Sequence, residues 1–310
     1  MERYFLVTGA AGFIGAAVAK RIIDAGYHVV TIDNLSTGHR EHIPDQVEFI
    51  EGSTFSTESI QQLNGKKFDA IIHIAGQSSG EISFEDPIYD LQTNGQSTLM
   101  LLEYARKTGC SKFIYASTMS VYGDHPSAEC DEETSQIPNS FYAVGKIASE
   151  HYMRIYARQY GLTCTALRLF NTYGEGQNLE NLKQGMISIY LAMAIKEGRI
   201  TVKGSKDRFR DFVYIDDVAE AFLRSIDREG SYEVMNVCTG HPVTVEEVVG
   251  TIIHELSEPI AVEYTHGTPG DQFGIYGNHS KITKVLGWEP QVSFHEGIRR
   301  MIRWAQELEF

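Results

Sequence analysis

A tyrosine and a lysine that could act together on an alcohol lie four residues apart, at Tyr142 and Lys146. On a helix, residues i and i+4 share one face, so the two side chains would be neighbours. An ammonium beside a phenol favours the phenolate, which is otherwise scarce because a free tyrosine has a pKa of about 10. The pair could therefore be a general base near neutral pH. The same spacing is common on helix surfaces, so its chemistry depends on the surrounding chain.

Hydroxyl side chains gather directly after an apolar run that is typical of a strand. They are Ser117, Thr118 and Ser120. Ligands of open α/β sheets bind outside the carboxyl ends of the strands. A hydroxyl at this position could share a hydrogen bond with a substrate alcohol, and the structural alternative is a Ser/Thr-rich turn.

Three glycines, Gly9, Gly12 and Gly15, lie between the first predicted strand and the first predicted helix. Glycines at such a turn let the backbone approach a pyrophosphate, and the helix N-terminus offers free N–H groups to it. The alternative is a glycine-rich turn without a ligand.

Asp33 ends the second predicted strand, 18 residues after Gly15. An acidic side chain there can accept hydrogen bonds from both hydroxyls of an adenosine ribose and would repel a 2′-phosphate. The sequence therefore favours NAD over NADP, while His39 and Arg40 keep NADP as an alternative. A turn that begins at Asp33 and Asn34 is the structural alternative.

The elements that must position these residues alternate regularly through the first 170 residues. Predicted strands cover residues 4–8, 28–32, 47–50, 70–75, 112–117 and 163–170. Predicted helices between them cover residues 13–24, 56–63, 87–107 and 140–160. The strand runs are continuously apolar, as in parallel sheets buried on both faces. We therefore predict an α/β fold with a doubly wound parallel sheet of the Rossmann type, and residues 1–170 as an NAD-binding domain.

The pattern is looser after residue 170. Helices are predicted over residues 182–197, 217–226, 244–256, 281–286 and 294–307, and strands over 200–203, 210–215 and 260–264. We expect residues 171–310 to form a smaller α/β lobe that binds the substrate, with segments near 210–240 returning to the first domain.

Composition excludes several classes of function. Among 310 residues, the net charge of −14 disfavours nucleic-acid and anionic-membrane partners. No apolar run approaches the ~20 residues of a membrane span, and the N-terminus enters a strand-like segment at once, which leaves no room for a signal peptide. The four cysteines have no metal-ligand spacing, so we expect reduced, mostly buried thiols, no metal and a cytoplasmic protein.

In their order and spacing, these motifs resemble those of the extended short-chain dehydrogenases/reductases. The resemblance is to the nucleotide-sugar epimerase/dehydratase branch and, within it, to the UDP-glucose (UDP-galactose) 4-epimerase group. It covers nearly the whole chain and is carried by residues 9–15, 33–38, 73–76, 117–123, 142–146, 170–174 and 210–217.

The resemblance implies a role for each matching residue. Tyr142 would be the base, Lys146 would hold the nicotinamide ribose and lower the pKa of Tyr142, and Thr118 would bridge to the reacting hydroxyl. The implied cofactor-binding residues are Gly9, Gly12, Phe13, Ile14, Gly15, Asp33, Asn34, Ser36, Thr37, Gly38, Ala75, Gly76, Gln77, Asn94, Ser117, Tyr142, Lys146 and Phe170. The implied substrate-binding residues are Ser79, Thr118, Tyr142, Asn171 and Arg210. Asn171 and Arg210 would face the nucleotide phosphates; alternatively, Arg210 is a solvated partner of Asp211.

Four positions depart from patterns of the family. Dehydratases of this branch carry Asp-Glu after the catalytic threonine, and related UDP-glucuronate decarboxylases carry Glu at the second place, where this chain has Met119 and Ser120. Neither side chain can exchange a proton with a substrate carbon or leaving group near pH 7, which disfavours dehydration and decarboxylation. Ser53 stands where many relatives have an Asp facing the adenine, and Thr268 where many 4-epimerases have a second phosphate-binding Arg.

The resemblance therefore implies an NAD-dependent 4-epimerase of a UDP-hexose or UDP-hexuronate that passes through a 4-keto sugar. A reductase or dehydrogenase of the same fold with net redox turnover, a 4-epimerase of another nucleotide sugar, and a non-catalytic NAD-binding protein are the alternatives. The predicted helices at 87–107 and 140–160 resemble the pair that forms the four-helix dimer interface of the family, so a homodimer is expected. Apolar residues along these helices are Leu91, Leu99, Leu101, Leu102, Ile147 and Ile155.

Overall fold

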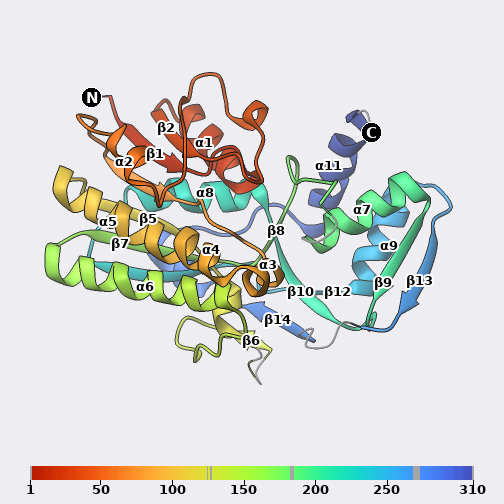
Figure 1. Cartoon of the computed structure of the whole chain (residues 1–310). Helices are drawn as coiled ribbons and strands as arrows, with labels where there is room; N and C mark the ends of the chain where they lie inside the picture. The colour runs from red at the N-terminus through yellow and green to blue at the C-terminus, as the bar shows by residue number, and fades with distance from the viewer. Residues whose placement is uncertain (1, 124, 126–127, 182–184, 268–272, 309–310) are drawn as a thin grey trace.

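A large parallel sheet between two layers of helices makes up most of the molecule, and a smaller lobe lies beside it (Figure 1). The computed structural model describes residues 2–123, 125, 128–181, 185–267 and 273–308. The predicted α/β fold, a doubly wound parallel sheet with a smaller α/β lobe, is confirmed.

The large sheet has the strand order β11-β7-β5-β4-β1-β2-β3, with every neighbouring pair parallel. Its strands are β1 (Tyr4–Thr8), β2 (His28–Asp33), β3 (Glu48–Glu51), β4 (Ala70–His73), β5 (Lys112–Thr118), β7 (Thr163–Leu169) and β11 (Tyr232–Val237). The chain builds outward from β1 to β3 and then continues on the other side of β1 with β4. Ligands of doubly wound sheets bind at this reversal of strand order, outside the carboxyl ends of the strands.

Side chains of the central strands divide between two buried clusters, one on each face of the sheet. On β1, Phe5 and Val7 belong to one cluster and Leu6 to the other. Because both faces are buried, the strand is apolar throughout, which explains why its sequence does not alternate. The covering helices are α1 (Phe13–Asp24) and α8 (Ile215–Ile226) on one face, and α5 (Ser97–Thr108) and α6 (Phe141–Tyr160) on the other (Figure 1).

The prediction of a single helix over residues 87–107 is wrong. The chain forms α4 (Pro87–Leu91), a π-helical segment η2 (Gln92–Gln96) and then α5. Thr98 Oγ1 donates to Asn94 O at 2.8 Å, which is a back-bond that bends helices. Gly95 also weakens the helix at this point. π-Helical turns occur often at functional sites, and this one carries a predicted cofactor-binding residue, Asn94.

The smaller lobe has a third buried cluster, formed between its strands and helices. Its strands are β8 (Asn171–Tyr173), β9 (Arg199–Lys203), β10 (Phe209–Tyr214), β12 (Pro242–Thr244) and β13 (Ala261–Thr265), and β14 (Gly274–Gly277) and β6 (Glu129–Cys130) extend the sheet of β10. Its helices are α7 (Met186–Glu197), α9 (Val245–Leu256) and α11 (Phe294–Glu307). The remaining elements are η1 (Arg40–His42), α2 (Thr57–Gln61), α3 (Gly80–Glu85), η3 (Met119–Tyr122) and α10 (Ser280–Leu286).

Element boundaries agree with the sequence pattern to within a few residues where the element is long. The strands β6, β8, β12 and β14 have two to four residues and therefore show no periodicity from which they could be predicted. Residues 182–184 of the helix predicted at 182–197, and the departure at Thr268, lie outside the described residues. The domain boundary near residue 170 stays a prediction; α8 and β11, from the second half of the chain, pack on and pair with the large sheet.

All four cysteines are free and buried, as expected. Burial raises the pKa of the Cys110 and Cys130 thiols to about 11 and that of Cys164 to about 12. Among the described residues, no helix has the length and apolar character needed to cross a membrane.

Candidate active site

The glycine turn joins the carboxyl end of β1 to the amino end of α1. Gly9 has a φ of 80°, and a Cβ on Gly15 would overlap the carbonyl of Gly9. Gly12 caps α1 without a side-chain hydrogen bond, so the first N–H groups of this helix face outward for a ligand. Phe13 and Ile14 begin the helix and pack against the third cluster. The turn therefore has the close approach and free donors that a pyrophosphate needs.

Asp33 ties the next loop to this turn. Its Oδ2 accepts a hydrogen bond from Ala11 N at 2.9 Å, and its Oδ1 accepts one from Leu35 N at 2.8 Å. The turn at Asp33 that the sequence left as an alternative is thus present. Each carboxylate oxygen has a further lone pair, so the turn does not prevent Asp33 from accepting ribose hydroxyls.

The loop after Asp33 lies directly over the glycine turn. A Cβ on Gly38 would lie 2.5 Å from the backbone of Ala11. Asn34 donates to Ser53 Oγ at 3.1 Å and accepts from Ser36 N at 3.1 Å. Asn34, Ser36 and Thr37 are exposed. The predicted cofactor residues of 33–38 are therefore gathered beside the turn at residues 9–15.

Lys146 is buried in α6, one turn after Tyr142. Its Nζ donates to Ala116 O at 2.9 Å and lies 5.6 Å from the centroid of the Tyr142 ring. Ser140 caps this helix by accepting from Ala143 N at 3.2 Å, which fixes where the helix begins. The Tyr-Lys pair thus shares one helix face, as the spacing predicts.

Thr118 joins Tyr142 from the end of β5. Its hydroxyl acts on the Tyr142 phenol and lowers the pKa of that phenol, against the effect of burial. Its Oγ1 also accepts from Ser120 N at 3.1 Å, which holds the hydroxyl at the start of η3. Ser117 points to the other face of the strand and donates to Glu150 Oε1 at 2.6 Å. Of the three hydroxyls, the structure therefore brings Thr118 to Tyr142.

Burial controls the protonation of this pair. It raises the pKa of Tyr142 to about 12, and the Thr118 hydroxyl opposes this rise. It lowers the pKa of Lys146 to about 8, and the charges of Asp90 and Glu150 oppose this fall. In the chain by itself the pKa of Tyr142 is thus raised, because desolvation disfavours the phenolate more than the Thr118 hydroxyl favours it.

Another group of the predicted cofactor-binding residues meets around Gly76. A Cβ on Gly76 would lie 2.5 Å from Asn94 Oδ1 and 3.7 Å from Lys146 Nζ. Asn94 Oδ1 is buried and has no hydrogen-bond partner among the described residues. Gln77 N donates to Thr93 Oγ1 at 3.3 Å, and Ala75 N donates to Thr8 Oγ1 at 3.1 Å. An orphaned acceptor beside a glycine cradle fits the ribose or amide of a bound NAD.

Asn171 and Arg210 lie on the paired strands β8 and β10. Asn171 Nδ2 donates to Asp211 O at 3.1 Å and contacts Met119 Sδ at 3.4 Å. Arg210 is buried, and burial together with the nearby Arg208 lowers its pKa to about 10. Asp211 instead accepts from Thr239 N at 2.8 Å, so Arg210 is not its solvated partner.

Two further predicted site residues, Ser79 and Phe170, lie beside the residues described so far. Ser79 caps α3 by accepting from Ile82 N at 3.3 Å, and its own N–H donates to Gln77 Oε1. Phe170 is buried between β7 and β8 and packs against Cys238 and Gly277. Ser79 is thus connected to the Gly76 side of the site, and Phe170 contributes to the core beneath it.

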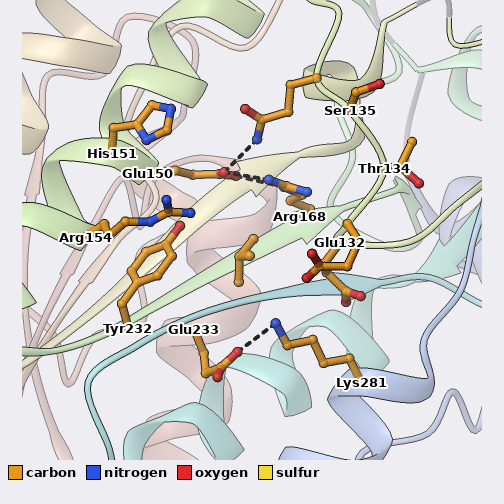
Figure 2. A pocket seen from close by; sticks show the side chains of 13 residues that line it. Glu132, Thr134, Ser135, Glu150, His151, Arg154, Arg168, Tyr232, Glu233 and Lys281 are labelled. Carbon is orange, nitrogen blue, oxygen red and sulfur yellow. Dashed lines mark hydrogen bonds and ion pairs between the residues drawn. The ribbon is translucent and has the colours of Figure 1, made fainter.

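The sequence motifs do not identify the buried ion pair Glu150–Arg168, which lies against β5, the strand that ends at Thr118. A cavity of about 410 Å³ is lined by the buried pair Glu150 and Arg168 (Figure 2), and by none of Tyr142, Lys146 and Thr118. Arg168 donates to the two Glu150 oxygens at 3.0 and 2.8 Å, and Glu150 in turn holds Ser117. Glu150 lies four residues after Lys146, and this spacing is a signal that could have identified it. Arg168 gives no such signal, because it is a lone charge in an apolar strand.

The turn at residues 9–15, Asp33 at the end of β2 and the Thr118–Tyr142–Lys146 group define a class: the chain is an extended short-chain dehydrogenase/reductase with a Rossmann fold. A model of the NAD dependent epimerase/dehydratase family matches residues 5–238. The chain belongs to this family, which confirms the predicted resemblance and the predicted cofactor, NAD.

Several named proteins are similar to the chain over nearly its whole length. The UDP-glucose 4-epimerase of Mycolicibacterium smegmatis is 33% identical over 306 residues, which are 96% of this chain and 97% of that protein. The crystal structure of the Thermotoga maritima UDP-glucose 4-epimerase with UDP-glucose has a TM-score of 0.93 at 32% identity and covers 98% of this chain and 99% of that one. The Thermus thermophilus UDP-glucose 4-epimerase in complex with NAD has a TM-score of 0.90 at 31% identity and covers 98% and 99%.

Proposed function

We propose that the protein is an NAD-dependent 4-epimerase of a UDP-sugar, either a UDP-hexose or a UDP-hexuronate. The observation that carries the proposal is the group Thr118–Tyr142–Lys146 next to two positions, Met119 and Ser120, that carry no carboxylate. The similarity to UDP-glucose 4-epimerases over nearly the whole chain supports the substrate class.

The proposed roles are those that the family resemblance implies, and the geometry of the Tyr142–Lys146 pair supports them. Tyr142 removes the proton of the 4-hydroxyl, and Thr118 shares a hydrogen bond with the same oxygen. Lys146 holds its positive charge under the phenol and offers N–H donors to the ribose of the cofactor. When bound, NAD would supply the reversible hydride transfer at the sugar, and its positive ring would favour the Tyr142 phenolate. Asn171 and Arg210 hold the phosphates of the substrate.

The absence of acid chemistry at Met119 and Ser120 favours epimerisation over dehydration. Met119 Sδ lies 3.4 Å from the Asn171 amide, and Ser120 Oγ accepts from Thr118 Oγ1 at 3.1 Å. Loss of water across two sugar carbons needs one group that takes a carbon-bound proton and another that protonates the leaving hydroxyl. A thioether and an alcohol supply neither near pH 7, so the ketone persists only as a bound intermediate.

Incubation of the purified protein without added NAD tests this proposal. UDP-glucose, UDP-galactose, UDP-glucuronate and the corresponding dTDP-, GDP- and CDP-sugars are screened by NMR and mass spectrometry. We expect a product of unchanged mass with inverted configuration at C4 from a UDP-sugar. Loss of water or of carbon dioxide would overturn the proposal. Turnover that requires stoichiometric NADH would instead establish the reductase alternative. No turnover on any of these sugar nucleotides would favour a non-catalytic NAD-binding protein.

We propose further that the protein is a cytoplasmic homodimer. An apolar patch of exposed side chains lies over α3, α4 and the start of α6; its members are Phe84, Ile88, Leu91, Phe141 and Val144. Of the residues named for the dimer helices, Leu91, Leu99 and Ile155 are exposed, whereas Leu101 and Leu102 are buried against the sheet. Contiguous apolar surface of this kind is typical of protein interfaces. The free, buried thiols support the proposed compartment.

A further inference from the structure

A buried carboxylate that the proposed reaction does not use lies beside the catalytic pair. Asp90 is the next-to-last residue of α4 and is 1% exposed. Its Oδ1 accepts from Gln77 Nε2 at 2.9 Å and from Asn94 Nδ2 at 3.1 Å. Its Oδ2 would be 3.5 Å from a Cβ on Gly145, the residue that precedes Lys146. Asp90 is therefore packed against α6 at the level of the Tyr-Lys pair.

These hydrogen bonds fix the direction of the Asn94 amide. Asn94 Nδ2 donates both to Asp90 Oδ1 and to Gln77 O, the latter at 3.0 Å. With its nitrogen held on this side, the amide presents Oδ1 to Gly76 and Lys146, where it has no partner among the described residues. A buried acceptor held in one direction is prepared for a donor that arrives with a ligand.

The charges around Lys146 also single out Asp90. Glu150 approaches from the same helix but forms a two-point ion pair with Arg168. His73, from β4, stays neutral because burial lowers its pKa to about 3. Tyr142 is a neutral phenol at pH 7. The hydrogen bonds to Asp90 come from neutral amides, so Asp90 is the carboxylate near Lys146 whose charge is not neutralised by an arginine.

We propose that Asp90 is a positioning residue of the active site, which directs the Asn94 amide toward the cofactor and supplies the counter-charge of the Lys146 ammonium. This inference rests on the proposed function where it is tested by turnover. Its second test measures NADH binding and does not require turnover.

The substitution Asp90→Asn preserves shape and removes the charge. Without that charge the pKa of Lys146 falls, so the alkaline limb of the pH–activity profile moves to lower pH. Asp90 also raises the pKa of Tyr142, so its loss moves the acid limb to lower pH as well. We expect both limbs to move the same way by about 1 pH unit, and turnover at pH 9 to fall about tenfold. Glu85→Gln removes an exposed charge from the neighbouring helix and is the matched control.

The second readout is NADH binding to cofactor-free protein, followed by fluorescence. Asp90→Asn should weaken NADH binding about tenfold, because the Asn94 amide is then free to turn. Asp90→Glu keeps the charge, but its longer side chain would press against Gly145. It should weaken NADH binding and leave both limbs of the pH–activity profile in place. Circular dichroism shows whether Asp90→Asn folds. If it does not, Asp90→Glu still tests the inference through NADH binding.

Two results would overturn the inference. One is a uniform loss of turnover in Asp90→Asn with both limbs unmoved and NADH affinity unchanged, which a merely structural role would give. The other is an Asp90→Asn profile and NADH affinity that match those of Glu85→Gln. If the wild type turns over no sugar nucleotide, the proposed function fails, while the NADH titration still decides whether Asp90 positions the cofactor site.

Discussion

Tyr142 and Lys146 show how burial acts on two groups of opposite charge type. Desolvation disfavours the phenolate of Tyr142 and the ammonium of Lys146 alike, so it raises the pKa of Tyr142 to about 12 and lowers that of Lys146 to about 8. At pH 7 the phenol is protonated and the lysine is charged. The lysine therefore keeps the charge that its role requires, whereas the tyrosine acts as a base only when a further positive charge is brought to it.

Replacement of the phenol tests its role as the base. Because Tyr142 is the group placed to take an alcohol proton, we expect Tyr142→Phe to lower turnover by about 10² to 10⁴. Folding and NAD content should be nearly unchanged, since the ring that packs beside Lys146 is retained. Tyr152→Phe, on the same helix, is the control and should keep wild-type turnover. Steady-state kinetics checks both; a Tyr142→Phe enzyme that retains most of its activity rejects the assignment.

Cofactor choice depends on the charge of Asp33. Denatured wild-type protein should release NAD and little NADP, because Asp33 repels a 2′-phosphate. Asp33→Asn should lose selectivity for NAD by about tenfold or more, since a hydrogen bond to a charged group contributes about 1.5–3 kcal/mol. Liquid chromatography of the released dinucleotides measures this, with the exposed Asp45→Asn as the control.

The opposite result for the wild type would reverse this assignment. Release of mainly NADP would direct attention to His39 and Arg40. In the structure His39 lies 3.8 Å from Glu41, and the Arg40 guanidinium lies 4.9 Å from the centroid of the Phe49 ring.

At the scale of elements, the buried pair Glu150–Arg168 connects α6 to β7. Both side chains are almost fully buried, so removal of one leaves an uncompensated charge. We expect Glu150→Gln to lower the free energy of unfolding by about 3 kcal/mol. Glu103→Gln breaks an exposed pair with Arg106 on α5 and should change stability little. Urea unfolding measures the stability of both variants. Equal losses of stability would show that the buried pair Glu150–Arg168 contributes no more than the exposed pair Glu103–Arg106.

The strands of the large sheet could be predicted because both faces are buried, so that a run such as residues 70–72 is apolar throughout. The interruption at η2 could not, because it depends on the Thr98 back-bond and on Gly95 and not on the periodicity of apolar residues. Tyr142, Lys146 and Thr118 follow from spacing and family resemblance. Arg168 is recognised only once the fold brings β7 to α6, since it is a lone charge in its strand. Asp90 is recognised only once the fold brings Gln77 and Lys146 to it.

At the scale of the whole molecule, the apolar patch over α3, α4 and α6 predicts the assembly. Light scattering at micromolar concentration should give the mass of two chains. The double variant Ile88→Glu/Leu91→Glu should give one, because it places two charges where apolar surface is to be buried. Val285→Glu, at an exposed apolar residue of α10 away from the patch, should remain dimeric. A wild-type monomer at this concentration contradicts the prediction.

The pairing of β11 with β7 has a consequence during synthesis of the chain. β11 is the edge strand of the large sheet and runs parallel to β7 over Tyr232–Val237, more than sixty residues after β7 has left the ribosome. Until then the backbone N–H and C=O groups on one side of β7 have no strand beside them, and such edges attract other chains. The nascent protein thus passes through a stage at which a sheet with this open edge is exposed, and slow translation between residues 170 and 232 would lengthen the period in which it can aggregate.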